Sequence, residues 1–175
     1  MKEVISTREK NDLGMSLIET MIALSILLIA SIGILSMAAV AMSTTENQGH
    51  LAARTAEYAQ DKMEQLMSLA YGDTTTDSTT FPSTSSGGSG LTIGGSSDPS
   101  TPVTTPGTGY VDYLDISGQP VSSTGAWYYE RVWQISQYST NLKQITVTAK
   151  VKAQVGAPAG ALPTSTLVSL KSSPF

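Results

Sequence analysis

The sequence contains no cysteine, which excludes disulfide bonds and cysteine-ligated metal sites. Charged residues are also scarce, at 14% of the chain against about a quarter in a typical soluble domain. Ten Lys and Arg residues against 14 Asp and Glu residues give a net charge of −4, and no basic patch stands out. Nucleic acid is therefore not expected to be a partner.

Catalytic and metal-binding patterns are missing as well. The single histidine, His50, has no second histidine and no cysteine with which to form a zinc site. The sequence has neither a P-loop nor a His-Glu-x-x-His pattern, and the spacing of its aspartates matches no calcium loop. We predict that the chain is not an enzyme and has no catalytic residue, cofactor or metal, with His50 at the surface or an interface.

The most prominent feature is an uncharged, mostly apolar run over residues 20–45. About 20 such residues, at ~1.5 Å each in a helix, cross the ~30 Å hydrocarbon core of a bilayer. Lys2, Arg8 and Lys10 precede the run, whereas the first basic residue after it is Arg54. Because cytoplasmic loops carry the excess of Lys and Arg, the N-terminal residues are predicted to lie inside the cell and the C-terminal part outside.

A polar leader, residues 1–14, ends in Gly14, and Met15-Ser16-Leu17-Ile18-Glu19 follows it at the entrance of the apolar run. This arrangement, over residues 1 to about 70, resembles the N-terminus of type IV prepilins. The resemblance implies cleavage by a prepilin peptidase between Gly14 and Met15, and N-methylation of Met15. Two positions depart from the common pattern, since Met15 stands where phenylalanine is commonest and Leu13 stands where a basic residue is frequent.

The resemblance also gives Glu19 a role. In pilins the carboxylate at this position is thought to pair with the N-terminal amine of a neighbouring subunit, so Glu19 is the expected assembly residue. From the residues alone a simpler interpretation stays open, in which the helix dipole stabilises Glu19 or its side chain reaches the lipid headgroups. The implied partners are other pilin or pseudopilin subunits, the prepilin peptidase and methyltransferase, the inner-membrane assembly platform and the membrane itself.

The implied location is the inner, cytoplasmic membrane, crossed once with the C-terminal domain outside, and then a pilus or a periplasmic pseudopilus. An ordinary secretory signal fits less well, because its apolar region spans only about 7–15 residues. The small residues Ala38-Ala39-Val40-Ala41 keep signal-peptide cleavage open as an alternative.

Residues 46–72 continue the helix with an amphipathic pattern. Apolar residues at helical spacing predict one buried face, consisting of Ala52, Ala56, Ala59, Met63, Leu66 and Ala70. Gly72 is the predicted C-cap. One helix over about residues 16–70 is therefore expected, in which residues 15–45 are the transmembrane and assembly part.

Residues 73–109 consist mostly of Ser, Thr, Gly and Pro. A stretch of this composition buries too little apolar surface to offset its ordering entropy. We expect a mostly flexible, exposed loop, in which a short turn at Leu91-Thr92-Ile93 docks.

Residues 110–175 predict an antiparallel sheet with strands near residues 110–116, 127–138, 144–153 and 166–170. The second strand is expected to place Trp127, Tyr129, Arg131, Trp133 and Ile135 on one face. Arg131 and Trp133 then form either a cation–π contact or an edge-of-core pair. The third strand alternates, with Ile145, Val147, Ala149, Val151 and Ala153 facing inward. The fold class is α+β and pilin-like, with the long helix packed on a small antiparallel sheet.

Residues 129–135 and 142–151 resemble, more weakly, the sheet of V-type minor pilins and of related type II secretion pseudopilins. We predict a structural subunit of a type IV pilus-like fibre, with a minor pilin preferred. A minor pseudopilin of a type II secretion system is the alternative within the family. A signal-anchored extracytoplasmic binding protein is the alternative from a different class.

Overall fold

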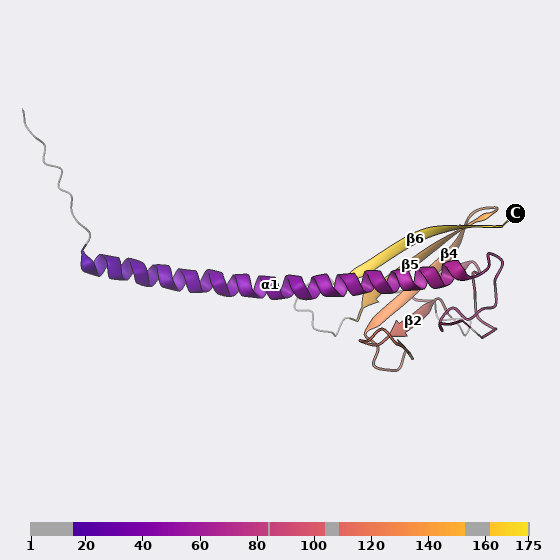
Figure 1. Ribbon diagram of the computed structural model, residues 1–175, viewed down its shortest axis with the longest axis horizontal. Helices are drawn as coiled ribbons and strands as arrows, with labels where there is room; N and C mark the ends of the chain where they lie inside the picture. The colour runs from indigo at the N-terminus through magenta and orange to yellow at the C-terminus, as the bar shows by residue number, and fades with distance from the viewer. Residues whose placement is uncertain (1–15, 84, 104–108, 153–161, 175) are drawn as a thin grey trace, which may run out of the picture. The chain divides into compact units, whose positions relative to one another are not determined.

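The computed structural model describes residues 16–83, 85–103, 109–152 and 162–174. The chain separates into two compact units, Met1–Thr45 and Glu46–Phe175. The described residues form one helix and six strands: α1 (Leu17–Ser68), β1 (Gly94–Gly95), β2 (Val111–Leu114), β3 (Pro120–Val121), β4 (Tyr129–Ser139), β5 (Leu142–Val151) and β6 (Thr164–Ser172). The predicted α+β class, with one long N-terminal helix and an antiparallel sheet, is confirmed (Figure 1).

Helix α1 begins within one residue of its predicted start and ends slightly earlier than predicted. At its start, the carbonyl of Ser16 accepts hydrogen bonds from the amides of Glu19 and Thr20. At its end, the amide of Leu69 binds the carbonyl of Leu66, three residues back, which tightens and closes the last turn. Gly72 does not have the positive φ of a C-cap glycine, so that prediction is wrong.

The strands form a sheet in the order β3-β2-β4-β5-β6, in which neighbours are antiparallel (Figure 1). Strand β1 lies off this path and pairs with β4. The longest ladder joins β4 to β5, which are connected by the tight turn at Thr140 and Asn141. Strand β2 lies between β3 and β4, and its register with β4 places Asp112 directly opposite Arg131.

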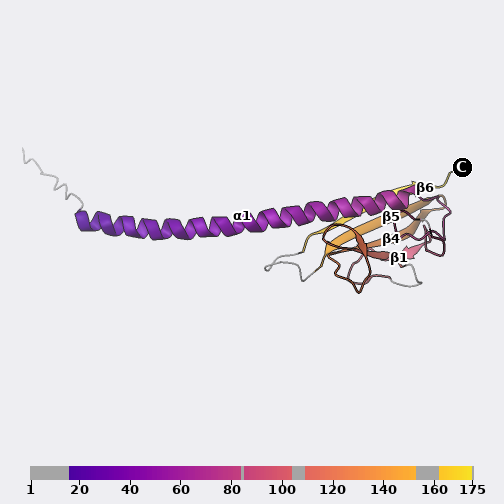
Figure 2. The ribbon, with the colours of Figure 1, turned by 60° about the horizontal axis from the view of Figure 1, so that its bottom comes forward.

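The core of the second unit lies between the last turns of α1 and one face of the sheet (Figure 2). Trp133 is the largest fully buried side chain, and its ring meets Tyr110 edge-on. The buried members are Tyr58, Ala59, Met63, Leu66, Leu91, Tyr110, Leu114, Tyr129, Trp133, Ile135, Ile145, Val147, Ala149 and Val151. The predicted packing of the residue 46–68 part of the helix on the sheet is thus observed.

The buried face of α1 differs in part from the predicted stripe. Ala59, Met63 and Leu66 are buried as predicted, but the other three stripe residues, Ala52, Ala56 and Ala70, are exposed. Thr55, Tyr58 and Lys62 are buried instead. The physical reason is that these side chains find partners on the sheet, such as the ring of Tyr129 for Tyr58 and the hydroxyl of Ser165 for Thr55.

The alternation predicted for residues 144–153 is confirmed in β5, where Ile145, Val147, Ala149 and Val151 are buried; Ala153 lies outside the described residues. Thr148, expected to face outward, is also buried and shares a hydrogen bond with the hydroxyl of Thr166. Trp127 precedes β4, which begins at Tyr129, so the alternation of that strand does not reach it. Its ring contacts Tyr113, on the face away from Leu114, so the predicted facing of Trp127 is wrong.

The Ser/Thr/Gly/Pro-rich segment departs in part from the expected exposed loop. The predicted docking of its turn is confirmed, since Leu91 is fully buried. Ser78 and Ser89 are buried too, and β1 adds to the sheet beside β4. Lys143 joins the residues just after α1 to this segment, because its ammonium group donates to the carbonyls of Tyr71 and Leu91 at 2.8 and 2.9 Å.

Two aspartates organise the turns at the start of this segment. The carboxylate of Asp73 accepts bonds from the amides of Thr75 and Thr76 and from the hydroxyl of Thr76. Asp77 binds the amide and the hydroxyl of Thr79 in the same way. Burial alone would raise the pKa of Asp73, but these hydrogen bonds outweigh it and lower the pKa below its usual value.

We predict that Thr76→Val, which removes the hydroxyl donor, raises the pKa of Asp73 toward its usual value. A carboxyl group whose folded-state pKa is lowered stabilises the fold above its unfolded pKa, and this contribution is lost as the pH falls through the folded value. The turn should therefore open at a higher pH in this variant. Carboxyl carbon NMR titration of the full chain measures both midpoints, with Thr74→Val as the control. Titration of Asp73 in the wild-type chain at or above its usual pKa would contradict this account.

Candidate functional site

The sequence-predicted site residues fall into two groups. Gly14 and Met15, the predicted cleavage and methylation positions, lie outside the described residues. Glu19 lies in the first turn of α1 and is exposed. An anion in this turn interacts favourably with the positive end of the helix dipole, by about 0.3–1 kcal/mol at an exposed site. The dipole is therefore only a modest reason to place a carboxylate there.

The part of α1 within the first unit is apolar around its whole circumference. Its Leu, Ile, Met and Val side chains are all exposed, from 55% at Ile22 to 77% at Leu17. The helix is long and apolar enough, by length and composition, to cross a membrane, and its most apolar part is not buried against the rest of the chain that the structure describes. Burying one large apolar side chain contributes about 1.5–3 kcal/mol, so the sum over this segment exceeds the net stability of a typical domain, about 5–15 kcal/mol.

The hydroxyl groups of this segment form hydrogen bonds within the helix itself. Each hydroxyl donates to the carbonyl of the residue three or four positions earlier, namely those of Thr20, Ser25, Ser31, Ser36, Ser43, Thr44 and Thr45. Such groups enter an apolar environment at little cost. Glu19 is the single ionisable residue between residues 16 and 45, and it is the one group there that still needs an external partner.

A second polar constellation lies in the core of the other unit, where α1 meets β2 and β4. The ammonium group of Lys62 lies 2.6 Å from Asp112 Oδ2. Arg131 binds the same carboxylate with two nitrogens, Nε at 2.7 Å and Nη2 at 2.9 Å. Its Nη1 donates to Asp61 Oδ2 at 2.7 Å. We call Asp61, Lys62, Asp112 and Arg131 the ion cluster.

The ion cluster is buried except at one corner. The side chains of Lys62, Arg131 and Asp112 are 0%, 3% and 5% exposed, whereas that of Asp61 is 53% exposed. Burial lowers the pKa of Lys62 although the charge of Asp112 opposes it. Burial also acts to lower the pKa of Arg131, but the charge of Asp112 and the hydrogen bonds that Arg131 donates to both aspartates outweigh it and raise that pKa. One buried carboxylate thus holds two buried cations.

Further contacts extend the ion cluster to other segments. Lys62 donates to the carbonyl of Ser78 at 2.6 Å and lies over the ring of Trp133, 4.7 Å from its centroid. Arg131 Nη1 also reaches the carbonyl of Tyr58 at 3.3 Å. The cation–π partner of Trp133 is therefore Lys62, and the suggested Arg131–Trp133 contact is not observed.

Sequence reasoning missed the ion cluster, although two signals for it were present. Lys62 interrupts the apolar positions Ala59, Met63 and Leu66 on the buried face of the helix. Asp112 has the same parity along β2 as the core residue Leu114. A charged residue at an apolar position predicts a partner of opposite charge, because an unpaired buried charge is very costly.

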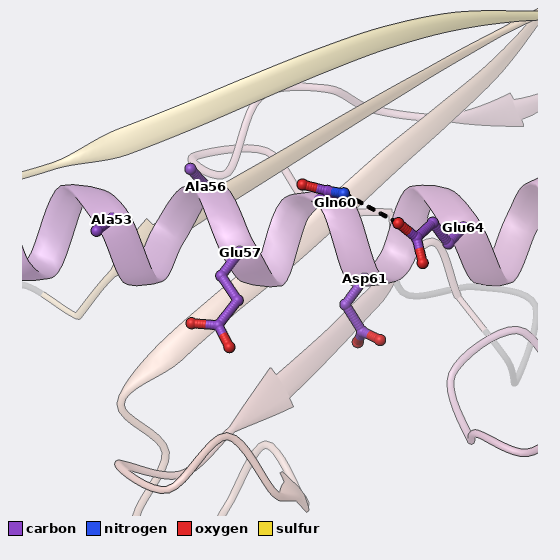
Figure 3. A pocket seen from close by; sticks show the side chains of 6 residues that line it. All are labelled: Ala53, Ala56, Glu57, Gln60, Asp61 and Glu64. Atoms are coloured by element: carbon purple, nitrogen blue, oxygen red, sulfur yellow. Dashed lines mark hydrogen bonds between the residues drawn. The ribbon is translucent and has the colours of Figure 1, made fainter.

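The exposed side of the same helix carries a row of acidic residues. Glu57, Asp61 and Glu64 line a shallow hollow together with Ala53, Ala56 and Gln60 (Figure 3). Glu57 and Asp61 point to the same side of α1, and Gln60 donates to Glu64 at 3.0 Å (Figure 3). All six side chains come from one helix, so the hollow has no opposing wall that would enclose a substrate.

No protein-family model, curated protein or solved structure matches the chain. Within residues 16–83, 85–103, 109–152 and 162–174, no three His, Asp or Glu side chains are placed to hold a metal ion. Because this finding covers only those residues, the expected absence of a metal site stays a prediction. His50 is exposed on α1, in line with the expected surface position.

We predict that Asp112→Asn destabilises the fold by about 3–5 kcal/mol, because it leaves Lys62 and Arg131 buried without their shared carboxylate. Lys62→Met should cost at most about 2 kcal/mol, since Asp112 keeps both bonds from Arg131 and the thioether still packs on Trp133. Asp61→Asn, at the exposed corner, should cost about 1 kcal/mol or less.

Guanidinium unfolding of the full chain in detergent, followed by tryptophan fluorescence, measures these differences. All three variants remove one charge, so the test is the order of their losses in the free energy of unfolding, with Asp112→Asn the largest and Asp61→Asn the smallest. A Lys62→Met variant as unstable as Asp112→Asn would show that burial of unpaired cations is not what the ion cluster prevents.

Proposed function

We propose that the chain is a structural subunit of a type IV pilus-like fibre, a minor pilin, with no enzymatic activity. In this proposal a prepilin peptidase cuts after Gly14, and the new N-terminus at Met15 is methylated. The helical segment from residue 15 to residue 45 first anchors the chain in the inner membrane and then packs in the core of the fibre. Residues 46–175 lie outside the membrane.

The observation that carries the proposal is the contrast between Glu19 and its surroundings. All hydroxyls of the adjacent apolar segment are bonded internally, and its large side chains are exposed around the whole helix. Such a surface favours lipid or other helices as neighbours over water. A carboxylate in that setting costs several kcal/mol unless a cation pairs with it.

Cleavage after Gly14 supplies such a cation. It creates an α-amine at Met15, four residues before Glu19 in the sequence. Between neighbouring subunits offset along their helices, the amine of one chain meets the carboxylate of the next. Pairing neutralises both charges only when the helices are in the correct register, so Glu19 selects and aligns subunits as they leave the membrane.

The pattern of β4 and β5 also supports a second candidate from the same family, a minor pseudopilin of a type II secretion system. The two candidates share cleavage, methylation and helix packing, and differ in the fibre they join. A purified pilus that contains the chain supports the first, and a periplasmic pseudopilus that contains it supports the second.

We predict that the chain extracted from the cell envelope begins at N-methylated Met15, as read by intact mass and N-terminal sequencing. Gly14→Val should keep residues 1–14 attached, whereas Leu13→Ala, one position earlier, should be cut normally. A wild-type chain that retains Met1 or starts after Ala39 or Ala41 would contradict the proposal. It would support the signal-anchored binding protein instead.

A further inference from the structure

The two edges of the sheet are built differently. One edge ends in β3, which has two residues, one of them Pro120. The other edge is β6, which has nine residues and no proline. Its one charged residue, Lys171, is turned to the carbonyl of Met67 in α1 at 2.5 Å. Of the usual protections of an edge strand, β6 lacks short length, proline and outward charge, and has one inward-pointing charge, that of Lys171.

The hydrogen bonds that flank the β5–β6 ladder show which backbone groups of β6 are open. Val151 donates its amide to the carbonyl of Pro163, and Ser173 donates to the carbonyl of Asn141. Both pairs continue the register of the ladder, so the odd-numbered residues of β6 point their backbone groups at β5. The even-numbered residues, Thr164, Thr166, Val168, Leu170 and Ser172, point theirs away from the sheet.

These outward backbone groups make no bond to another segment within the part of the chain that the structure describes. The side chains of the same residues lie on the sheet face away from the core, because Val147 and its core neighbours pair with odd-numbered positions. Val168 and Leu170 are 58% and 47% exposed. The edge thus offers a row of donors and acceptors beside two apolar side chains and no outward charge.

A second copy of this chain fits the edge poorly. Antiparallel pairing of β6 with another β6 turns the second copy by 180° in the sheet plane, so residues 46–68 would run in opposite directions in the two chains. In the proposed function residue 46 directly follows the membrane-anchored segment, so it lies at the membrane in every chain, whereas this pairing would put the two copies of residue 46 at opposite ends of the pair. A copy related by translation would offer its opposite edge, which is formed by β3 and β1, has only two residues in each of these strands and carries Pro120.

We propose that β6 is an acceptor edge for an extended, uncharged segment of a different protein, which adds a strand to the sheet. Main-chain hydrogen bonds to Thr166, Val168 and Leu170 hold the incoming strand. Its apolar residues at alternate positions lie beside Val168 and Leu170. This is the recognition mode in which the backbone supplies affinity and alternate side chains supply selectivity.

The probe for this edge is a nine-residue peptide of alternating valine and serine, capped at both ends so that it carries no charge, as the proposed segment requires. We expect it to bind the full chain in detergent and to slow hydrogen exchange at the amides of Val168 and Leu170. Val168→Pro removes an outward amide that β5 does not use, and should weaken binding at least about tenfold. Val168→Thr keeps that amide and should bind within about threefold of wild type.

A second peptide is N-methylated at every residue whose amide would point to β6. It tests the same hydrogen bonds without altering the protein, and it should not bind. Failure of the plain peptide to bind, or equal binding by Val168→Pro, would overturn the proposal. So would efficient disulfide formation between two chains carrying Val168→Cys in membranes, which would show that a second copy occupies the edge. The wild-type chain has no cysteine to confuse this readout. These outcomes are independent of where the mature N-terminus lies.

Discussion

A single buried carboxylate, that of Asp112, determines how the helix and sheet of the second unit fit together. It holds Lys62 from α1 and Arg131 from β4, which are 0% and 3% exposed. Neither cation tolerates burial without it, because desolvation of an unpaired charge costs far more than a typical hydrogen bond returns. The apolar residues around the ion cluster provide most of the stabilisation, but a shift of the helix by one turn would separate the charges. The ion cluster therefore fixes the position of α1 along the sheet, which apolar packing alone does not determine.

The same helix meets two different physical demands. Between residues 46 and 68 its buried face is mixed, and the charged and polar groups there find partners on the sheet, as Thr55 does with Ser165. Between residues 17 and 45 the polar hydroxyls bond to the helix itself, and Glu19 is left over. The first pattern is typical of a helix packed in its own domain. The second is typical of a helix that passes from lipid to other helices, which is the basis of the proposed fibre subunit.

The sequence was informative wherever a simple periodicity decides the structure. The strict alternation of β5 predicted Ile145 and Val147 in the core, and the uncharged run predicted the apolar part of α1. Prediction failed where partners are far apart in the chain. Nothing local connects Lys62 with Asp112, so a helix-periodic pattern favoured Ala56, which is exposed. Local composition also gave no sign of β1, because its two glycines are held by pairing with β4 rather than by strand propensity.

The central claim is that Glu19 pairs with a neighbouring subunit during assembly. The most direct measurement is the amount of Glu19→Ala chain in purified fibres relative to the membrane fraction, with Glu57→Ala, an exposed change on the same helix, as the matched control. The account predicts that Glu19→Ala is cut, methylated and anchored normally, but enters fibres at least about tenfold less than wild type, which corresponds to the loss of one charge pair. Incorporation of Glu19→Ala at the level of Glu57→Ala would contradict it.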